Sequence, residues 1–117
     1  MEPRHPIERR REPRQAVNAY GRIWYGPQYN LWADCRISDR SPSGARIEVS
    51  AVYRLPRRLI FAHHGAGPLF EAVLKWQRGD AAGLSLEPCA AAAQTQPWFD
   101  RISRELKALQ LNGASST

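Results

Sequence analysis

The feature of this sequence that most constrains its fold is an alternation of apolar and polar side chains with a period of two residues. The alternation is clearest between residues 31 and 38, where the apolar positions are Leu31, Ala33, Cys35 and Ile37. A period of two places these side chains on one face of a β-strand and the intervening polar ones on the other. We therefore predict a strand with one buried and one exposed face.

Five further segments show strand-like patterns. They are residues 17–25, 45–50, 57–63, 69–78 and 81–88. The clusters GPQY, SDRSPSG, HGAG and GD separate several of these segments and are rich in residues that favour turns. Six strands with mostly short connections predict a mainly β fold, either an antiparallel barrel or a sandwich.

The C-terminal part of the chain changes to a helical period. After Trp98, large apolar residues recur at spacings of four, four and three, at Ile102, Leu106 and Leu109. This spacing places them on one face of an α-helix, and Pro97 suits the first turn, where its missing N–H is not needed. We predict a helix of about four turns that packs against the β-domain.

The length of 117 residues suits one small domain with a single hydrophobic core. We assign residues 15–111 to the β-domain with its helix, and residues 112–117 to a frayed end. Residues 1–14 combine prolines with a majority of charged side chains, so they predict a flexible N-terminal arm.

The net charge is +6, and only Lys75 and Lys107 among the 17 basic residues are lysines. The arginine guanidinium is a planar fork of donors that suits phosphate and the acceptor edge of guanine. No apolar run is long enough to cross a bilayer, and the N-terminus lacks the apolar core of a signal peptide. Together with the widely separated Cys35 and Cys89, these features favour a cytoplasmic protein without membrane insertion.

The sequence offers little support for a metal site. His63 and His64 are adjacent, so on a strand their side chains point to opposite faces, and no third ligand accompanies them. Cys35 and Cys89 lack a CxxC spacing, and Cys35 lies on the apolar side of its strand, as a small core residue does. We expect neither a metal nor another cofactor.

Catalysis is not indicated either. Asp39, Ser41 and Ser43 are close in sequence, but the GxSxG elbow is absent and no histidine is related to them by spacing. We therefore expect a protein that is not an enzyme. Packing explains most of the tryptophans, but three of them could border a bound ligand: Trp24, Trp32 and Trp76.

Two short motifs are placed around the first two predicted strands. An RRxxxR motif precedes the first strand and consists of Arg9, Arg10 and Arg14. A DxSxxG motif follows the second strand and consists of Asp39, Ser41 and Gly44. Either motif alone is weak, since basic arms and Asp-containing turns are common. Their conjunction, in this order and beside strands of one β-domain, is much more specific.

With these motifs the chain resembles the PilZ domain family, bacterial receptors for the second messenger cyclic di-GMP. The resemblance covers most of the chain. It includes RLPRRLIF at the place of the fourth strand, EAVLKWQRGDAAGLSLE at the place of the final hairpin, and the C-terminal helix. It implies a six-stranded antiparallel β-barrel whose arginine arm folds over ligand held against the DxSxxG turn.

The resemblance also implies a role for each motif residue. The arginines of RRxxxR are expected to bind phosphate oxygens and the guanine O6 and N7 atoms, and to stack on the purines. Asp39 is expected to accept hydrogen bonds from guanine N1 and N2, and Ser41 to supply a hydroxyl. Gly44 is expected to let the backbone approach the ligand closely.

A single-domain receptor of this kind is expected to signal to a separate, unidentified downstream protein when ligand orders the arm. Two alternatives remain open at this point. One is a basic β-barrel that binds nucleic acid, suggested by the net charge and the aromatic residues. The other is a PilZ-like interaction module that binds no ligand.

Overall fold

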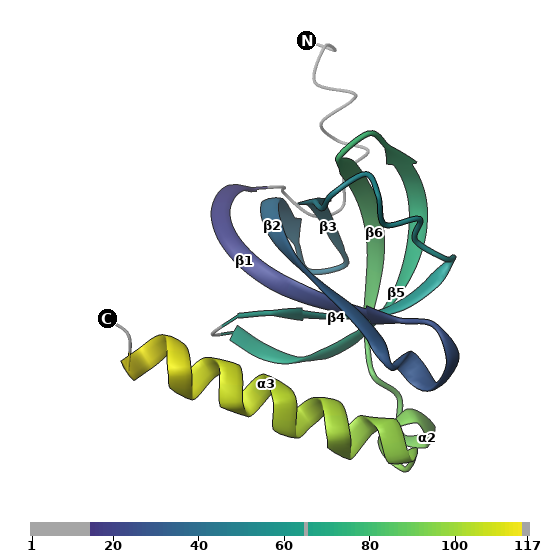
Figure 1. The fold of residues 1–117 in the computed structure, drawn as a ribbon, viewed down its shortest axis with the longest axis vertical. Helices are drawn as coiled ribbons and strands as arrows, with labels where there is room; N and C mark the ends of the chain where they lie inside the picture. The colour runs from purple at the N-terminus through teal and green to yellow at the C-terminus, as the bar shows by residue number, and fades with distance from the viewer. Residues whose placement is uncertain (1–14, 65, 116–117) are drawn as a thin grey trace, which may run out of the picture.

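The computed structural model describes residues 15–64 and 66–115. Its six strands form a closed barrel in the order β1-β2-β3-β6-β5-β4, and every neighbouring pair is antiparallel. The mainly β prediction is confirmed, as are the six-stranded antiparallel barrel and the C-terminal helix (Figure 1). The strands are β1 (Gln15–Tyr25), β2 (Leu31–Ser41), β3 (Gly44–Glu48), β4 (Arg58–His63), β5 (Ala66–Arg78) and β6 (Ala81–Pro88).

The barrel interior is filled by apolar side chains from all six strands. Its fully buried members include Ile23, Ile37, Ile47, Leu59 and Phe61. The alternation of side-chain directions along each strand places them there, because every second side chain of a closed barrel points inward.

The face predicted from residues 31–38 is confirmed in most positions. Ala33, Cys35 and Ile37 are buried in the barrel interior. Leu31 is an exception, with 50% of its surface exposed. It is the first residue of β2 and pairs with Tyr25, the last residue of β1, beside the connection between the two strands.

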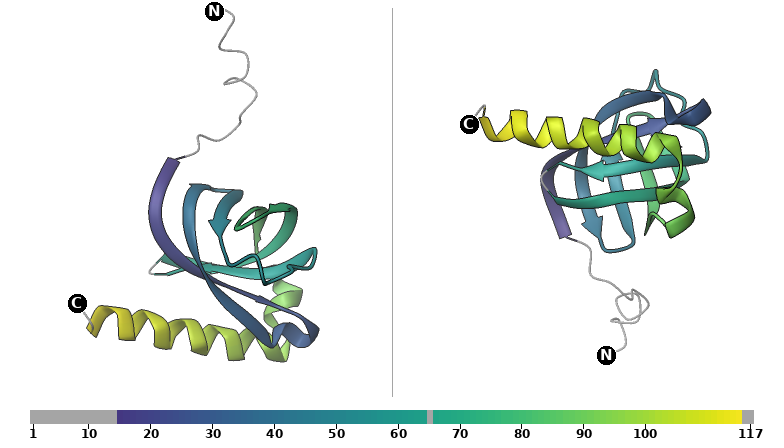
Figure 2. Two further views of the ribbon diagram at one scale, coloured as in Figure 1. Left: turned by 45° about the horizontal axis from the view of Figure 1, so that its top comes forward. Right: turned by 90° about the horizontal axis from the view of Figure 1, so that it is seen from below.

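A second apolar cluster lies outside the barrel, beneath α3 (Pro97–Ser115). Trp98, Ile102 and Leu106 of the helix pack against outward-facing residues of the strands, among them Trp24 and Ile60. Three of the four residues of the predicted helix face therefore contact the barrel, whereas Leu109 is only partly buried and does not belong to this cluster. Figure 2 shows α3 along the outside of the strands, with its C-terminal end projecting beyond them.

Two short helical segments join the larger elements. The 3-10 helix η2 (Pro27–Tyr29) connects β1 to β2, and α2 (Ala91–Gln94) leads from β6 into α3. Within the described residues, neither α-helix has the length and apolar character that a bilayer crossing requires.

The end of α3 differs from the prediction. We expected the helix to finish near residue 111 and residues 112–117 to be frayed, whereas α3 includes every residue up to Ser115. Asn112 and Gly113 are weak helix formers, but propensity is a small effect and no proline interrupts this stretch.

Candidate functional site

The residues of the DxSxxG motif lie at the hairpin between β2 and β3. Asp39 and Ser41 belong to the end of β2, and Gly44 begins β3 opposite Ser41. The prediction of one long turn over residues 38–44 was therefore wrong, because only Pro42 and Ser43 form the turn. A two-residue connection suffices for antiparallel neighbours, and polar turn formers are also tolerated at a strand end.

The register of β1 places its first residues beside this hairpin. Gln15 pairs with Arg40, and Ala16 pairs with Asp39. Arg14 immediately precedes Gln15 in the sequence. The chain therefore enters the barrel directly next to the DxSxxG motif. The RRxxxR residues Arg9, Arg10 and Arg14 themselves lie outside the described residues.

Asp39 and Ser41 face away from the barrel interior. Between them, Arg40 points inward, because its guanidinium carbon lies 5.1 Å from the ring centroid of Phe70, a residue of the interior cluster. Neighbouring side chains on a strand point to opposite faces, so Asp39 and Ser41 point outward. Gly44 shares the face of Ser41, because a Cβ built on Gly44 would lie 3.5 Å from the Ser41 hydroxyl.

The outer surface next to the hairpin is made of small residues. Gly44 pairs with Ser85 of β6, and Arg46 pairs with Gly83. These four residues share the outward face, since Leu84, between Gly83 and Ser85, is buried in the interior. Three of the four positions carry a small side chain or none, and Gly44 and Gly83 are buried, so the exposed Arg46 is the one large side chain among them.

Trp76 of β5 borders this surface. Its indole ring covers Gly83 so closely that a Cβ at Gly83 would overlap the ring. The tryptophan is 40% exposed, and the guanidinium carbon of Arg46 lies 5.7 Å from its ring centroid. We call the surface formed by Asp39, Ser41, Gly44, Arg46, Gly83, Ser85 and Trp76 the hairpin face.

The hairpin face combines an aromatic ring, a guanidinium and a carboxylate. The ring of Trp76, which is 40% exposed, suits the face of a planar base. A guanidinium such as that of Arg46 can pair with a phosphate, and a carboxylate such as that of Asp39 can accept hydrogen bonds from amino groups. Groups of these kinds can bind and orient a ligand.

Sequence reasoning identified only part of this surface. Arg46 and Gly83 were missed, although the outward position of Arg46 follows from the alternation of residues 45–50. Their proximity to the motif depends on the pairing of β3 with β6, which no local pattern in the sequence records.

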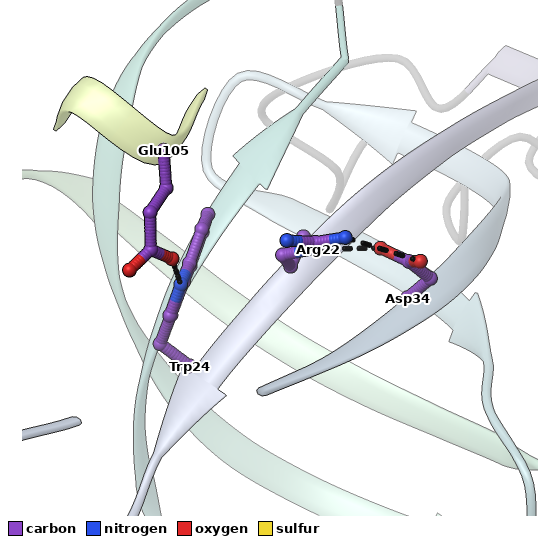
Figure 3. Close-up of polar contacts among 4 residues, drawn as sticks. All are labelled: Arg22, Trp24, Asp34 and Glu105. Atoms are coloured by element: carbon purple, nitrogen blue, oxygen red, sulfur yellow. Dashed lines mark hydrogen bonds and ion pairs between the residues drawn. The ribbon is translucent and has the colours of Figure 1, made fainter. Parts of the chain in front are cut away.

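The tryptophans proposed to border a ligand have three different environments. Trp76 lies on the hairpin face, and Trp32 packs its ring 3.7 Å from the guanidinium of Arg22, on β1 and β2. Trp24 was predicted to be available to a ligand, and this was wrong. It is fully buried beneath α3, where its indole N–H donates to Glu105 (Figure 3).

The other reactive candidates do not form a site. His63 ends β4 and His64 lies in the following turn, and burial lowers the pKa of both imidazoles below the ordinary value. Across residues 15–64 and 66–115, no three His, Cys, Asp or Glu side chains are grouped as a metal would require. Cys35 is buried in the interior as predicted, and this burial raises the pKa of its thiol to about 12.

Comparison with known proteins adds no family assignment. No protein-family model matches the sequence, and no curated protein is significantly similar to it.

Proposed function

We propose that this protein is a receptor for cyclic di-GMP, which it binds on the hairpin face. The proposal combines the resemblance of the sequence to PilZ domains with the geometry of the barrel. It requires no bond breaking, so the protein acts as a sensor and not as an enzyme. Its place would be the bacterial cytoplasm, where this messenger is available.

One observation carries the proposal. Gln15 pairs with Arg40 and Ala16 pairs with Asp39, so the residue that follows Arg14 in the sequence begins the strand that lies beside the DxSxxG motif. The two motifs are separated by a whole hairpin in the sequence, and each is weak alone. A shared ligand is a physical reason for one motif to lead directly into the strand that pairs with the other motif.

The chemistry of the ligand matches the surface. Cyclic di-GMP carries two anionic phosphates and two guanines, so it calls for cations, flat apolar surfaces and acceptors for the guanine amino group. Arg46, Trp76 and Asp39 of the hairpin face supply these three properties. In the proposed complex, Arg9, Arg10 and Arg14 complete the site from the N-terminal side.

The proposed signal passes to another protein. Ligand would hold the arginines of residues 1–14 against the hairpin face and so create a surface that is absent from the free protein. A downstream partner protein would then bind that surface. The proposal specifies this partner only by that binding.

The competing nucleic-acid function has one observation in its favour. Tyr20 and Trp32 are 59% and 49% exposed on the outside of β1 and β2, as stacking residues of a nucleic-acid binder are. However, the neighbouring Arg22 forms an ion pair with Asp34 at 2.7 Å, and Arg36 forms one with Glu48 at 2.7 Å. These pairs reduce the positive potential that backbone phosphates need.

Isothermal titration of the full chain with cyclic di-GMP tests the proposal, with GTP and cyclic GMP as competitors of similar chemistry. We expect selective binding at roughly micromolar concentration or tighter. Arg10→Ala and Ser41→Ala should weaken it at least about tenfold, as loss of a charge-assisted or buried hydrogen bond does. Arg11→Ala is the matched control, because it removes an adjacent arginine outside the motif.

Two results would contradict the proposal. One is the absence of heat at about 100 µM cyclic di-GMP, well above the affinity expected of a receptor. The other is tight binding of single-stranded oligonucleotides with a steep salt dependence and equal losses in Arg10→Ala and Arg11→Ala. That second pattern would assign the arginines to nucleic acid.

A further inference from the structure

An open depression with a volume of about 410 Å³ lies at the end of the barrel opposite the hairpin face. It is bounded by the β1–β2 connection, by Pro56 and the first residue of β4, and by the beginning of α3. The two sites are at opposite ends of β2, because β2 runs from this connection to the β2–β3 hairpin. We call the depression beside η2 the η2 cavity. Its volume is within the range of small-molecule sites.

The wall formed by η2 has a strained backbone. Gln28 and Tyr29 have positive φ angles of 55° and 52°, a conformation that side-chain-bearing residues rarely adopt. Strain of this kind persists only where the surroundings enforce it, and it occurs preferentially at functional sites. Both residues line the cavity.

The helix α3 enforces this conformation. The Nη2 atom of Arg101 donates to the carbonyl oxygens of Gln28 and Tyr29, at 2.9 and 2.6 Å. The ring of Tyr29 meets the ring of Trp98 edge to face, with centroids 4.9 Å apart. The cavity wall is therefore held in place before any ligand arrives, which lowers the entropic cost of binding.

The polar groups of the η2 cavity favour an anion. Arg58 is its one charged lining residue, and Gln28 and Gln96 add carboxamides that donate and accept hydrogen bonds. No carboxylate of residues 15–64 or 66–115 forms an ion pair with Arg58. Burial, followed by the charge of Glu71, raises the pKa of the Tyr29 phenol, so this group stays neutral and can donate.

We propose that the η2 cavity binds a small carboxylate that carries a flat apolar group. Arg58 forms the paired hydrogen bonds that a guanidinium makes with a carboxylate, and the two glutamines fix its orientation. The apolar group lies against the rings of Tyr29 and Trp98. The site is separate from the hairpin face, so the inference does not depend on cyclic di-GMP binding.

A carboxylate with a flat apolar group could belong to either of two kinds of molecule. One is a free aromatic acid, and the other is the C-terminal residue of a polypeptide. Benzoate represents the first and N-acetylphenylalanine the second. Benzamide and N-acetylphenylalaninamide are their neutral counterparts of nearly the same shape.

The test is a titration of the isotope-labelled full chain with each of the four compounds, followed by NMR. We expect one of the two acids to shift the side-chain amide signals of Gln28 and Gln96 and the indole signal of Trp98. The affinity of its neutral counterpart should be lower by about tenfold or more, because that compound lacks the charge-assisted pair with Arg58. The tighter of the two acids identifies the source.

Substitution of one arginine separates this site from general attraction to a basic protein. Arg58→Gln should weaken the acid about tenfold or more, whereas Arg57→Gln should leave it unchanged. Arg57 is an exposed neighbour that does not line the cavity, so it is a matched control. Equal binding of acid and amide, equal losses in the two variants, or no shift at about 10 mM ligand would overturn the inference.

Discussion

The indole N–H of Trp24 donates a hydrogen bond to the carboxylate of Glu105 at 2.9 Å, across 81 positions of the sequence. Trp24 belongs to the outer face of the barrel and Glu105 to α3, and the tryptophan is fully buried between them (Figure 3). The bond satisfies the one polar side-chain atom of Trp24, which is fully buried in this interface. It therefore specifies how the helix lies on the barrel.

Replacement of Glu105 should show how much this bond contributes. We expect Glu105→Leu to lower the free energy of unfolding by about 1–3 kcal/mol, because it leaves a buried donor without an acceptor. Glu105→Gln keeps an amide oxygen at the same place and should cost less. The Arg101–Glu105 ion pair, at 3.7 Å and partly exposed, is also lost in both variants and contributes little. Urea unfolding measures both, and equal losses would argue against the bond.

Gly21 of β1 is expected to tolerate no side chain. A Cβ there would lie 2.5 Å from the carbonyl oxygen of Ala62 and 3.1 Å from the Ile37 side chain. The first contact is with backbone, which cannot rotate away, so Gly21→Ala should cost about 1–3 kcal/mol or more. Thermal unfolding would measure the loss.

Gly79 provides the contrasting case. A Cβ there meets nothing within 4 Å, but its φ of +58° disfavours residues with a side chain. Gly79→Ala should cost about 1–2 kcal/mol, and Gly79→Asn should cost less because asparagine adopts this conformation more readily. At Gly21, asparagine should be at least as harmful as alanine. The opposite order would show that backbone conformation, and not space, limits Gly21.

The stability of the fold should fall in mild acid. Burial lowers the folded-state pKa of His63 and His64 below the ordinary value of 6.5, so the unfolded chain binds protons more readily. Their contribution to stability is present above pH 6.5 and is lost as the pH falls through the folded-state values. Urea midpoints between pH 7.5 and 5 measure this loss. The variant His63→Gln with His64→Gln should show a weaker pH dependence, and an unchanged one would assign it to other groups.

The hairpin face can be tested through Trp76. If cyclic di-GMP stacks on this ring, Trp76→Ala should weaken binding about fivefold to a hundredfold, the usual effect of one base–aromatic contact. Trp32→Ala is the matched control, because Trp32 is similarly exposed but lies on β1 and β2 beside Arg22. Titration calorimetry of both variants gives the comparison. Equal effects would exclude a specific role for Trp76.

Patterns within a single segment determined much of this protein. The alternation at Ala33, Cys35 and Ile37 predicted the inner face of β2, and the spacing of Trp98, Ile102 and Leu106 predicted the helix face that meets the barrel. Both follow from local geometry, because the periods of a strand and of a helix fix which side chains share a face. The length of a strand is less well determined, as the motif at Asp39 and Ser41 shows: polar residues there continue β2.

Only the tertiary structure decided which faces meet. Trp24 lies on the outer face of β1, and nothing near it in the chain shows that α3 covers that face. Likewise, the neighbours of Asp39 on the hairpin face come from β3, β6 and β5, through pairings between distant residues such as Arg46 with Gly83. A local pattern fixes the direction of a side chain relative to its own strand. Its partners depend on the closure of the barrel, which is a property of all six strands together.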